Sequence, residues 1–378
     1  MNFKKIKWKH YINYIVIGLF TAVMGSMSVF GSLNASALYL LEKIAISIIL
    51  AVSLSLVVGF LGELSLGHAG FMCVGAYLGG KVAALLVPSL GNGILTLVIA
   101  LLVGAGAAAL CGVIIGIPAL RLRGDYLAIV TLAFGEIVKS IFQNTSKETF
   151  GGAIGLSTPR FDKKYLFIIA FVLVLLTLWI IQNLIRSKHG RAVTAIRDNE
   201  IAARATGINV TKYKLITFTL SAAFAGIAGV LYSYSNFTVQ SAKFGYNYSI
   251  EILVMVVLGG MGTINGSIVA ATLITFLNTK LATVLTGDLA ILQNLFYAVI
   301  LILIVIYNNA PALKDFRRKY NLSAFLKRFS KKKDDPSHVK DDTQKWDVVP
   351  TKIEMNEVLS VDMVPPEMKD YTGKEGKK

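Results

Sequence analysis

The feature that most limits the possible folds of this chain is its series of long apolar runs. Runs such as 93–117, 165–185 and 215–235 reach the roughly 20 residues with which an α-helix crosses the hydrocarbon core of a bilayer. Only helices and closed barrels satisfy all of their backbone polar groups in lipid. The chain is also 16% charged, whereas a soluble protein carries about 25% charged residues. The sequence therefore predicts an all-α, polytopic transmembrane protein.

We expect about ten transmembrane helices in a membrane domain at 11–310. The expected spans are 11–31, 44–61, 62–86, 93–117, 125–142, 165–185, 215–235, 250–258, 267–281 and 289–307. The first run is longer than the 7–15 apolar residues of a signal peptide, so we interpret it as a retained span. A basic segment at 1–10 places the N-terminus in the cytoplasm, and ten crossings place the C-terminus there too. Merging 250–281 into one span would export the basic residues that follow 310, which the positive-inside rule disfavours.

The charge of the chain is explained by membrane topology. The net charge is +16, but the basic residues concentrate beside apolar spans, where they set orientation and contact anionic headgroups, so we expect no nucleic-acid partner. Residues 311–378 form a cytoplasmic tail that is first basic and then mixed in charge, with few aromatic residues. A segment of this composition buries too little apolar surface to fold alone, so we predict that the tail is mostly disordered.

Motifs for cofactors are absent from the sequence. Cys73 and Cys111 are too few for a disulfide framework or a metal site. The segment Gly75–Lys81 matches G-x-x-x-x-G-K, but Val82 follows it where a P-loop needs Ser or Thr, and the match lies in an apolar run. We therefore expect no cofactor and no enzymatic activity in this chain. If ATP drives its function, another subunit binds the nucleotide.

One polar loop, 186–214, differs from an ordinary connection between two spans. It holds seven basic residues against Asp198 and Glu200, which places it in the cytoplasm. Asp198 is a suitable N-cap for a short helix, Glu200 puts a carboxylate in its first turn, and Gly207 can end it in the left-handed conformation. We expect the small side chains of Ala202, Ala203 and Ala205 to be exposed. This pattern predicts a docking helix for another protein, with an ordinary charged turn as the alternative.

Ionisable residues and glycine breaks inside apolar runs mark candidate positions along a translocation path. Such residues are costly in lipid, and non-helical backbone is tolerated there only against protein or a water-filled cavity. The alternative is local packing, in which His68 is a hydrogen-bond donor, the glycines allow close helix contacts and Asp125 caps its helix. The candidates are Glu63, Ser65, Gly67, His68, Gly70, Gly124, Asp125 and Glu136.

Four blocks of sequence together resemble a known family. They are GELSLGHAGFMCVGAY at 62–77, RLRGDYLAIVTLAFGEIVK at 121–139, GRAVTAIRDNEIAARATGINVTKYKLITFTLSAAFAGIAGVLY at 190–232 and VLGGMGTINGSIVAA at 257–271. Over about residues 36–308, the chain resembles the membrane permeases of branched-chain amino-acid ABC importers. The tail departs from that pattern, because these permeases usually have a short C-terminus.

The resemblance implies a bacterial plasma-membrane importer that works by alternating access. Its partners would be a second, homologous permease, two cytoplasmic ATPases that bind ATP, and an extracytoplasmic substrate-binding protein. In the family, the segment that matches 190–207 contacts the ATPase. The coupling residues carried over to this chain are Gly190, Arg191, Arg197, Asp198, Asn199, Glu200, Ala202, Ala203 and Gly207.

Three alternatives remain open. Related permeases carry urea or short amides, and nothing in the intramembrane residues selects a branched-chain amino acid over these. An ion-coupled secondary transporter would use Glu63, Asp125 and Glu136 as proton or cation sites. A membrane scaffold would use its tail to recruit partners.

Overall fold

A computed structural model describes residues 12–30, 34–122, 124–159, 161–284, 298, 299 and 302. Almost all of this part is helical, which confirms the predicted fold class. The helices are α1 (Ile12–Val29), α2 (Ala35–Ser55), η2 (Leu56–Leu61), α3 (His68–Leu90), α4 (Ile94–Ala119), α5 (Asp125–Asn144), α6 (Lys147–Phe150), η3 (Gly152–Ile154), α7 (Lys163–Arg186), α8 (Lys188–Asp198), α9 (Glu200–Ala205), α10 (Val210–Ser235), η4 (Ser241–Phe244), α11 (Tyr246–Gly259) and α12 (Ile264–Val284). Two short strands, β1 (Leu156–Ser157) and β2 (Thr238–Val239), pair antiparallel.

Nine of the ten expected spans contain a helix in this part of the chain. Five stretches are long and apolar enough to cross a membrane by length and composition: Ala35–Leu61, His68–Leu90, Ile94–Ala119, Tyr165–Arg186 and Val210–Ser235. The expected tenth span at 289–307, the N-terminal segment 1–10 and the tail 311–378 lie outside the described residues, apart from three isolated positions in the span.

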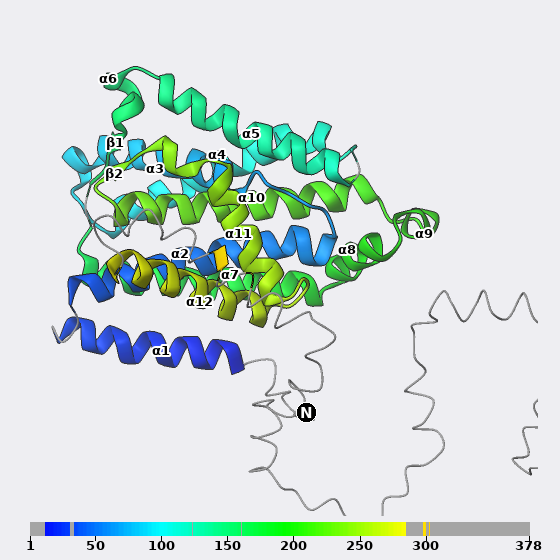
Figure 1. Cartoon of the computed structure of the whole chain (residues 1–378), viewed down its shortest axis with the longest axis horizontal. Coiled ribbons are helices and arrows are strands. Elements are labelled where there is room, and N and C mark those ends of the chain that lie inside the picture. Colours follow the sequence, from blue (N-terminus) through cyan, green and yellow to red (C-terminus); the bar gives the residue numbers. More distant parts are fainter. Residues whose placement is uncertain are drawn as a thin grey trace, which may run out of the picture. The chain divides into compact units, whose positions relative to one another are not determined.

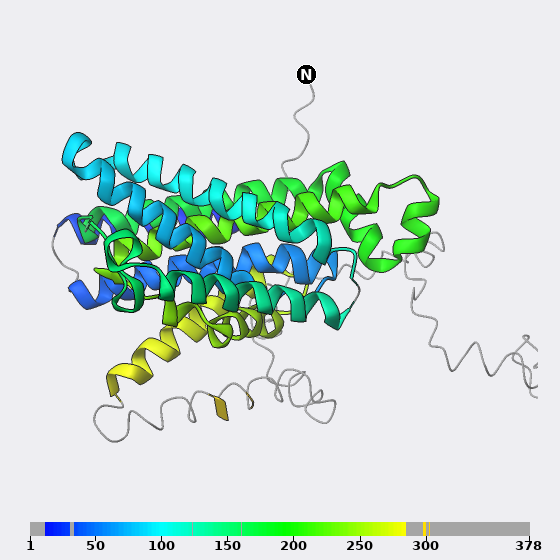
Figure 2. The ribbon, with the colours of Figure 1, turned by 90° about the horizontal axis from the view of Figure 1, so that it is seen from above.

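The bundle is built around α2. Figures 1 and 2 show α2, in blue, lying lengthwise among the other long helices, and it contacts α7, α10, α11 and α12. Ile49, Leu50 and Leu54 are fully buried. A helix that is apolar on all sides belongs in a core, because every face then meets another helix. The apolar sequence of α2 therefore explains its central position.

Helices α3, α4 and α10 pack closely because glycines face one another. A Cβ atom on Gly75 would lie 2.3 Å from the carbonyl oxygen of Gly226, and one on Gly226 would lie 2.6 Å from the carbonyl oxygen of Gly104. No side chain fits at these contacts. Small residues allow helix backbones to approach each other in a membrane, where packing rather than the hydrophobic effect drives association.

The segment 62–67 breaks the path between α2 and α3. The π-helix η2 continues α2, and Gly62 ends it with a φ of 80°. The next residues are extended and run back along the bundle, as Figure 1 shows, so that α3 begins only at His68. The third span was expected to begin at 62, which is wrong by six residues, because this non-helical segment precedes the helix.

A second break precedes α11, and a tight turn follows it. Residues 236–245 contain β2 and η4, and α11 then begins beside the middle of α5. The turn at 260–263 separates α11 from α12, and Gly259 lies against Gly266 across it. The expected pair of helices at 250–281 is therefore confirmed. Both α3 and α11 therefore begin partway along the bundle, beside α5.

Candidate functional site

The loop 186–214 folds into a helical element at one end of the bundle. We call residues 188–207 the coupling element; it comprises α8 and α9 and lies at the right of Figure 1. Ser187 caps α8, since its hydroxyl accepts hydrogen bonds from the backbone N–H groups of His189 and Gly190. Gly190 is buried, and a Cβ there would lie 2.0 Å from the carbonyl oxygen of Ile185. Arg191 is exposed.

The N-cap expected at Asp198 is instead one residue later. Asp198 is the last residue of α8, and its carboxylate pairs with Arg197 at 2.9 Å. Asn199 has extended backbone angles that break the helix, and its Oδ1 accepts the N–H of Ala202 at 3.0 Å. Asp and Asn are both good N-caps. The engagement of Asp198 with Arg197 leaves the capping role to Asn199.

Gly207 ends α9 as predicted, with a φ of +85°. The N–H of Ile208 bonds the carbonyl of Ala203 at 3.1 Å, and the N–H of Gly207 bonds that of Arg204 at 3.1 Å. These two bonds form a Schellman motif, which satisfies carbonyls at the helix end. Ile208 also packs with the buried cluster that contains Ala203, a contact that often accompanies this motif. The short helix is therefore fixed at both ends.

The expected exposure of Ala203 is wrong. Its side chain is 4% exposed and packs in a cluster with Leu61, Val193, Ile196 and Val210. This cluster joins the coupling element to η2 and α10. The exposed side chains of α9 include Ala202, Ala205 and Ile201, which is 74% exposed. The exposed apolar surface of this helix therefore centres on Ile201.

A buried lysine connects the coupling element to the break before α3. Lys214 on α10 is 4% exposed, and its Nζ contacts Glu63 Oε1 and, at 3.2 Å, Glu200 Oε2. Glu200 also accepts a hydrogen bond from Arg204 at 2.8 Å. Glu63, expected along a translocation path, thus takes part in a charge network that also includes the first turn of α9.

Arg197 makes a second connection in the same place. Its Nη1 donates to the carbonyl oxygen of Gly59 in η2 at 3.1 Å. Its aliphatic stem fills the space that a Cβ on Gly62 would occupy, with Cγ 2.6 Å from that position. Gly262, in the turn between α11 and α12, also lies against Gly59. The coupling element, η2 and this turn therefore meet at one point.

The remaining path candidates fall into two groups. Gly124 and Asp125 lie at the α8–α9 end, where Gly124 has a φ of 58° and precedes the first residue of α5. The segment 65–70 lies inside the bundle against α5: a Cβ on Gly67 would lie 2.7 Å from the carbonyl oxygen of Thr131, and Gly70 approaches Gly135 similarly.

Two polar residues of this segment are buried. His68 Nε2 lies 2.9 Å from Ser53 Oγ on α2, which fits the alternative of a packing contact. The hydroxyl of Ser65 is buried and has no hydrogen-bond partner among the described residues. The structure therefore does not unite all eight candidates in one site.

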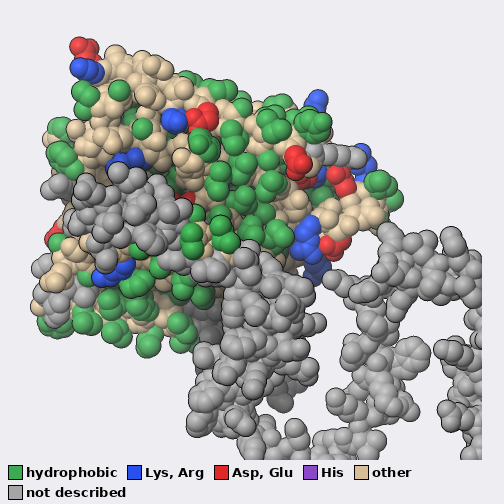
Figure 3. Space-filling view, viewed as in Figure 1, with side chains coloured by type: hydrophobic (Ala, Val, Ile, Leu, Met, Phe, Trp, Pro, Cys, Tyr) green, Lys and Arg blue, Asp and Glu red, His purple; other side chains and the backbone are tan. Residues whose placement is uncertain are grey.

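Glu136 lies near the middle of α5 and joins this helix to the start of α11. One carboxylate oxygen accepts the backbone N–H of Tyr246 at 2.8 Å, and the other contacts Lys139 Nζ at 2.9 Å. The Lys139 and Glu136 side chains are 24% and 33% exposed. Figure 3 shows hydrophobic side chains over much of the middle of one face of the bundle, with charged side chains at the α8–α9 end and others toward the opposite end.

Lys139 and Lys214 were missed as site residues. Lys139 follows Glu136 by three residues inside an apolar run, and opposite charges at that spacing pair on one helix face. That signal was available in the sequence. The sequence did not indicate the partners of Lys214, which the sequence analysis counted only among the basic residues of the loop.

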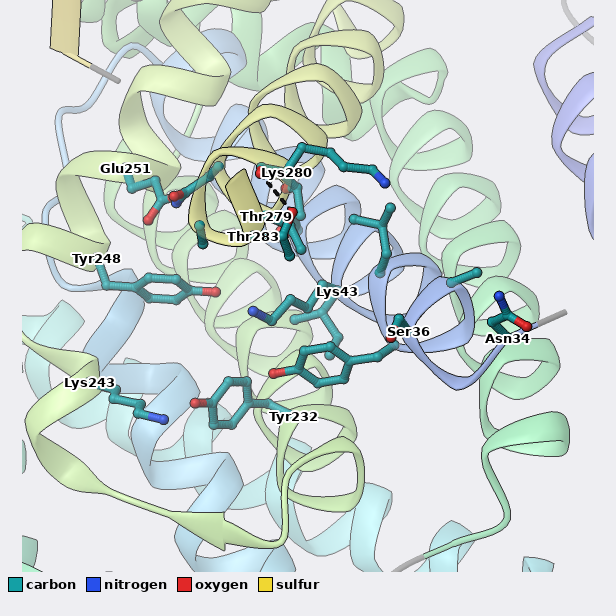
Figure 4. Close-up of a pocket in the computed structure, with 18 of the residues that line it drawn as sticks. Asn34, Ser36, Lys43, Tyr232, Lys243, Tyr248, Glu251, Thr279, Lys280 and Thr283 are labelled. Atoms are coloured by element: carbon teal, nitrogen blue, oxygen red, sulfur yellow. Dashed lines mark hydrogen bonds between the residues drawn. The ribbon is translucent and has the colours of Figure 1, made fainter. Parts of the chain in front are cut away.

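A cavity of about 770 Å³ lies between α2, α10, α11, α12 and η4. Figure 4 shows Lys43, Tyr232 and Tyr248 pointing into it. Glu251 on α11 accepts a hydrogen bond from Asn278 on α12 at 3.0 Å at its edge. Polar lining at membrane depth is typical of a hydrated crevice. The sequence analysis did not predict this cavity, although Lys43 and Glu251 stand within or beside apolar runs.

Comparison with known proteins gives a consistent set of matches. A family model described as branched-chain amino acid transport system / permease component matches residues 36–307. The high-affinity branched-chain amino acid transport system permease protein LivM of Salmonella typhimurium is 41% identical over 262 residues, which cover 61% of this chain and 60% of LivM. This chain therefore spans less than two thirds of the length of that relative.

More distant relatives match as well. The ribose import permease protein RbsC of Escherichia coli K12 is 28% identical over 285 residues, 71% of this chain and 84% of RbsC. The probable branched-chain amino acid transport permease protein LivH of Methanocaldococcus jannaschii is 30% identical over 142 residues, 38% of this chain and 44% of LivH. No solved structure matches this chain.

Proposed function

Because this chain belongs to the family of branched-chain amino acid transport permeases, we propose that it is the pore subunit of an ATP-binding-cassette importer for branched-chain amino acids. It spans the bacterial plasma membrane with both termini in the cytoplasm. A second, homologous permease completes the pore, and the presence of both LivM and LivH among the relatives supports such a pair. Two cytoplasmic ATPases supply the energy, and an extracytoplasmic binding protein delivers the substrate.

The observation that carries this proposal is the form of the coupling element. A six-residue helix is capped by Asn199, ended by Gly207 and anchored by buried Ala203. It presents Ile201, which is 74% exposed, beyond the apolar bundle. A carrier that works alone does not need a rigid helix with an exposed apolar side chain on a cytoplasmic loop. A permease driven by separate ATPases needs such a helix as a contact surface.

The contacts of the element suggest how ATPase movement reaches the membrane. A displacement of α9 pulls on Glu200 and therefore on Lys214 and Glu63. Glu63 begins the extended segment that leads to α3, and Arg197 holds the end of η2. Movement of the coupling element thus shifts the helix ends inside the bundle, which is the kind of change that alternating access requires.

The docking surface is tested with substitutions on α9. Ile201→Ser removes an exposed apolar contact, and Ala202→Trp adds bulk on the same surface. Both variants should reduce recovery of the ATPases with the permease, and with it substrate-stimulated ATP hydrolysis, at least fivefold. Thr149→Trp, a change at an exposed residue of α6 at the opposite end of the bundle, should leave recovery unchanged. Normal recovery with Ile201→Ser and Ala202→Trp would exclude α9 as the contact.

Two experiments separate the rival functions. Uptake by this chain alone in liposomes, without ATPases, would favour an ion-coupled carrier. Deletion of 312–378 should leave uptake intact in an importer. A scaffold that recruits partners through its tail would lose its function.

A further inference from the structure

The Glu136–Lys139 pair lies near the middle of α5, where an exposed charge is unexpected in a membrane-spanning helix. Glu136 is 11 residues from the start of α5 and eight from its end, or about 16 Å and 12 Å at the helical rise of 1.5 Å per residue. In the proposed transmembrane orientation, α5 crosses a hydrocarbon core about 30 Å thick, and Glu136 lies near the middle of that core. Charged side chains at that depth face a protein interior or a water-filled cavity, because contact with lipid is costly.

The pair is not sealed inside this chain. The two side chains keep 24% and 33% of their surface open. Tyr246 and Ile250, one turn apart on α11, are also exposed, at 51% and 41%. The open surface therefore combines an anion, a cation and apolar side chains. A purely structural ion pair needs no such opening.

The contacts of Glu136 leave both charges able to accept a new partner. One oxygen of Glu136 is held by the backbone N–H of Tyr246, which fixes the carboxylate at the beginning of α11. Among the described residues, the other oxygen contacts Lys139 Nζ alone. Gly245 keeps this place open, because a Cβ there would lie 3.2 Å from Nζ and 3.4 Å from the carboxylate.

We propose that Glu136 and Lys139 form a mid-membrane subsite for the zwitterionic backbone of an amino acid. The substrate's ammonium group replaces the Lys139 ammonium at the Glu136 oxygen that does not bind Tyr246. The substrate's carboxylate then pairs with the Lys139 ammonium. Tyr246 and Ile250 contact an apolar side chain. Net charge at the site stays zero with and without substrate, which avoids leaving an unpaired ion in the membrane. This proposal rests on the proposed function. A subsite of this kind binds an amino acid in preference to urea or a short amide, because only the amino acid carries both charges.

A cycle of neutral variants tests the subsite in the complete importer, reconstituted in liposomes with saturating binding protein. ATP-dependent leucine uptake by the wild-type complex tests the proposed function by itself. Glu136→Gln and Lys139→Gln should each lower leucine uptake at least tenfold. The double variant should be no better, because both charges that bind the substrate are then missing. Glu148→Gln, a change at an exposed residue of α6, serves as the matched control and should match the wild type.

The double variant separates recognition from structure. Each single change leaves one charge without its partner, whereas the double change leaves none, so a structural pair is rescued by the second change. Recovery of uptake to within twofold of the wild type in the double variant would overturn the subsite. Wild-type uptake in either single variant would overturn it as well.

Protection from alkylation gives a readout that does not depend on whether these variants assemble. In a complex whose permease carries Ile250→Cys and lacks Cys73 and Cys111, saturating leucine should slow modification by a small thiol reagent at least threefold. Isovaleramide, an uncharged short amide, should give no protection. Equal protection by both compounds, or by neither, would show that the site does not recognise a zwitterion.

Discussion

At the scale of single residues, a few backbone and side-chain positions determine whether the coupling element keeps its shape. Gly207 has a φ of +85°, and a Cβ there would meet nothing within 4 Å. A substitution at this position therefore tests backbone conformation without a steric clash. A substitution of Lys214 instead tests electrostatics, because this side chain neutralises the carboxylates of Glu63 and Glu200.

We expect Gly207→Val to destabilise the end of α9 by about 1 kcal/mol or more, since β-branched residues are poorly tolerated in the left-handed region. Because α9 is then wrongly oriented, less ATPase should co-purify with this permease variant. Gly207→Asn is the matched variant, because Asn adopts this conformation more readily, and it should stay close to the wild type. Equal loss in both variants would mean that the backbone angle is not the cause.

Lys214→Met should lower the stability of the permease. Removal of one partner of a fully buried ion pair costs about 3–5 kcal/mol, and the effect here should be about 1–3 kcal/mol because Glu63 and Glu200 retain partial contact with solvent. Thermal unfolding of the purified permease measures the change. Addition of Glu63→Gln to Lys214→Met should recover part of the loss. No recovery would place the main effect of Lys214 elsewhere.

At the scale of elements, the packing of α3, α4 and α10 depends on glycine contacts, and the position of α9 depends on its neighbours. Apolar periodicity and length were sufficient to predict the helices, because a membrane requires long apolar segments whatever their partners. Capping by Asn199 rather than Asp198 was not predictable, since both residues suit an N-cap. Burial of Ala203 was not predictable either, because Leu61, which covers it, lies far away in the sequence.

The candidate path illustrates the same limit. Glycines and ionisable residues correctly indicated the break at 62–67, but they did not reveal which depth each residue occupies. Glu63 and Glu136 have similar apolar neighbours in sequence, yet one contacts Lys214 near the coupling element and the other lies at mid-depth.

Gly226→Ala should weaken the contact between α10 and α4. The new methyl group would lie 2.6 Å from both the Gly104 carbonyl oxygen and Ala108 Cβ, so the helices must separate. We expect a fall in unfolding temperature of at least 5 °C and lower expression in the membrane. Gly106→Ala on α4, where a Cβ meets nothing within 4 Å, is the control and should be neutral or slightly stabilising. The glycine contact would be dispensable if both variants unfolded at the wild-type temperature.

At the scale of the whole molecule, the proposed orientation places α8 and α9 in the cytoplasm and α6 outside. These elements lie at opposite ends of the bundle in Figure 1. The basic residues of the coupling element support this orientation, because positive charge is retained on the cytoplasmic side.

Single cysteines test the orientation in a background without Cys73 and Cys111. An impermeant thiol reagent applied to intact cells should label Thr149→Cys and leave Lys188→Cys unlabelled. Permeabilised cells should show labelling at both positions, which controls for local accessibility. Labelling at position 188 in intact cells would reverse the proposed topology.

The charge network around Lys214 also has a consequence for synthesis. Glu63 and Lys214 are 151 residues apart in sequence, and a ribosome that adds about 5–20 residues per second needs roughly 8–30 s to make that stretch. Throughout that interval α1, α2 and η2 are already made, while the ammonium group that neutralises Glu63 does not yet exist. The growing chain therefore has to keep this carboxylate at the aqueous surface. The two halves of the permease are joined at this point only when α10 emerges.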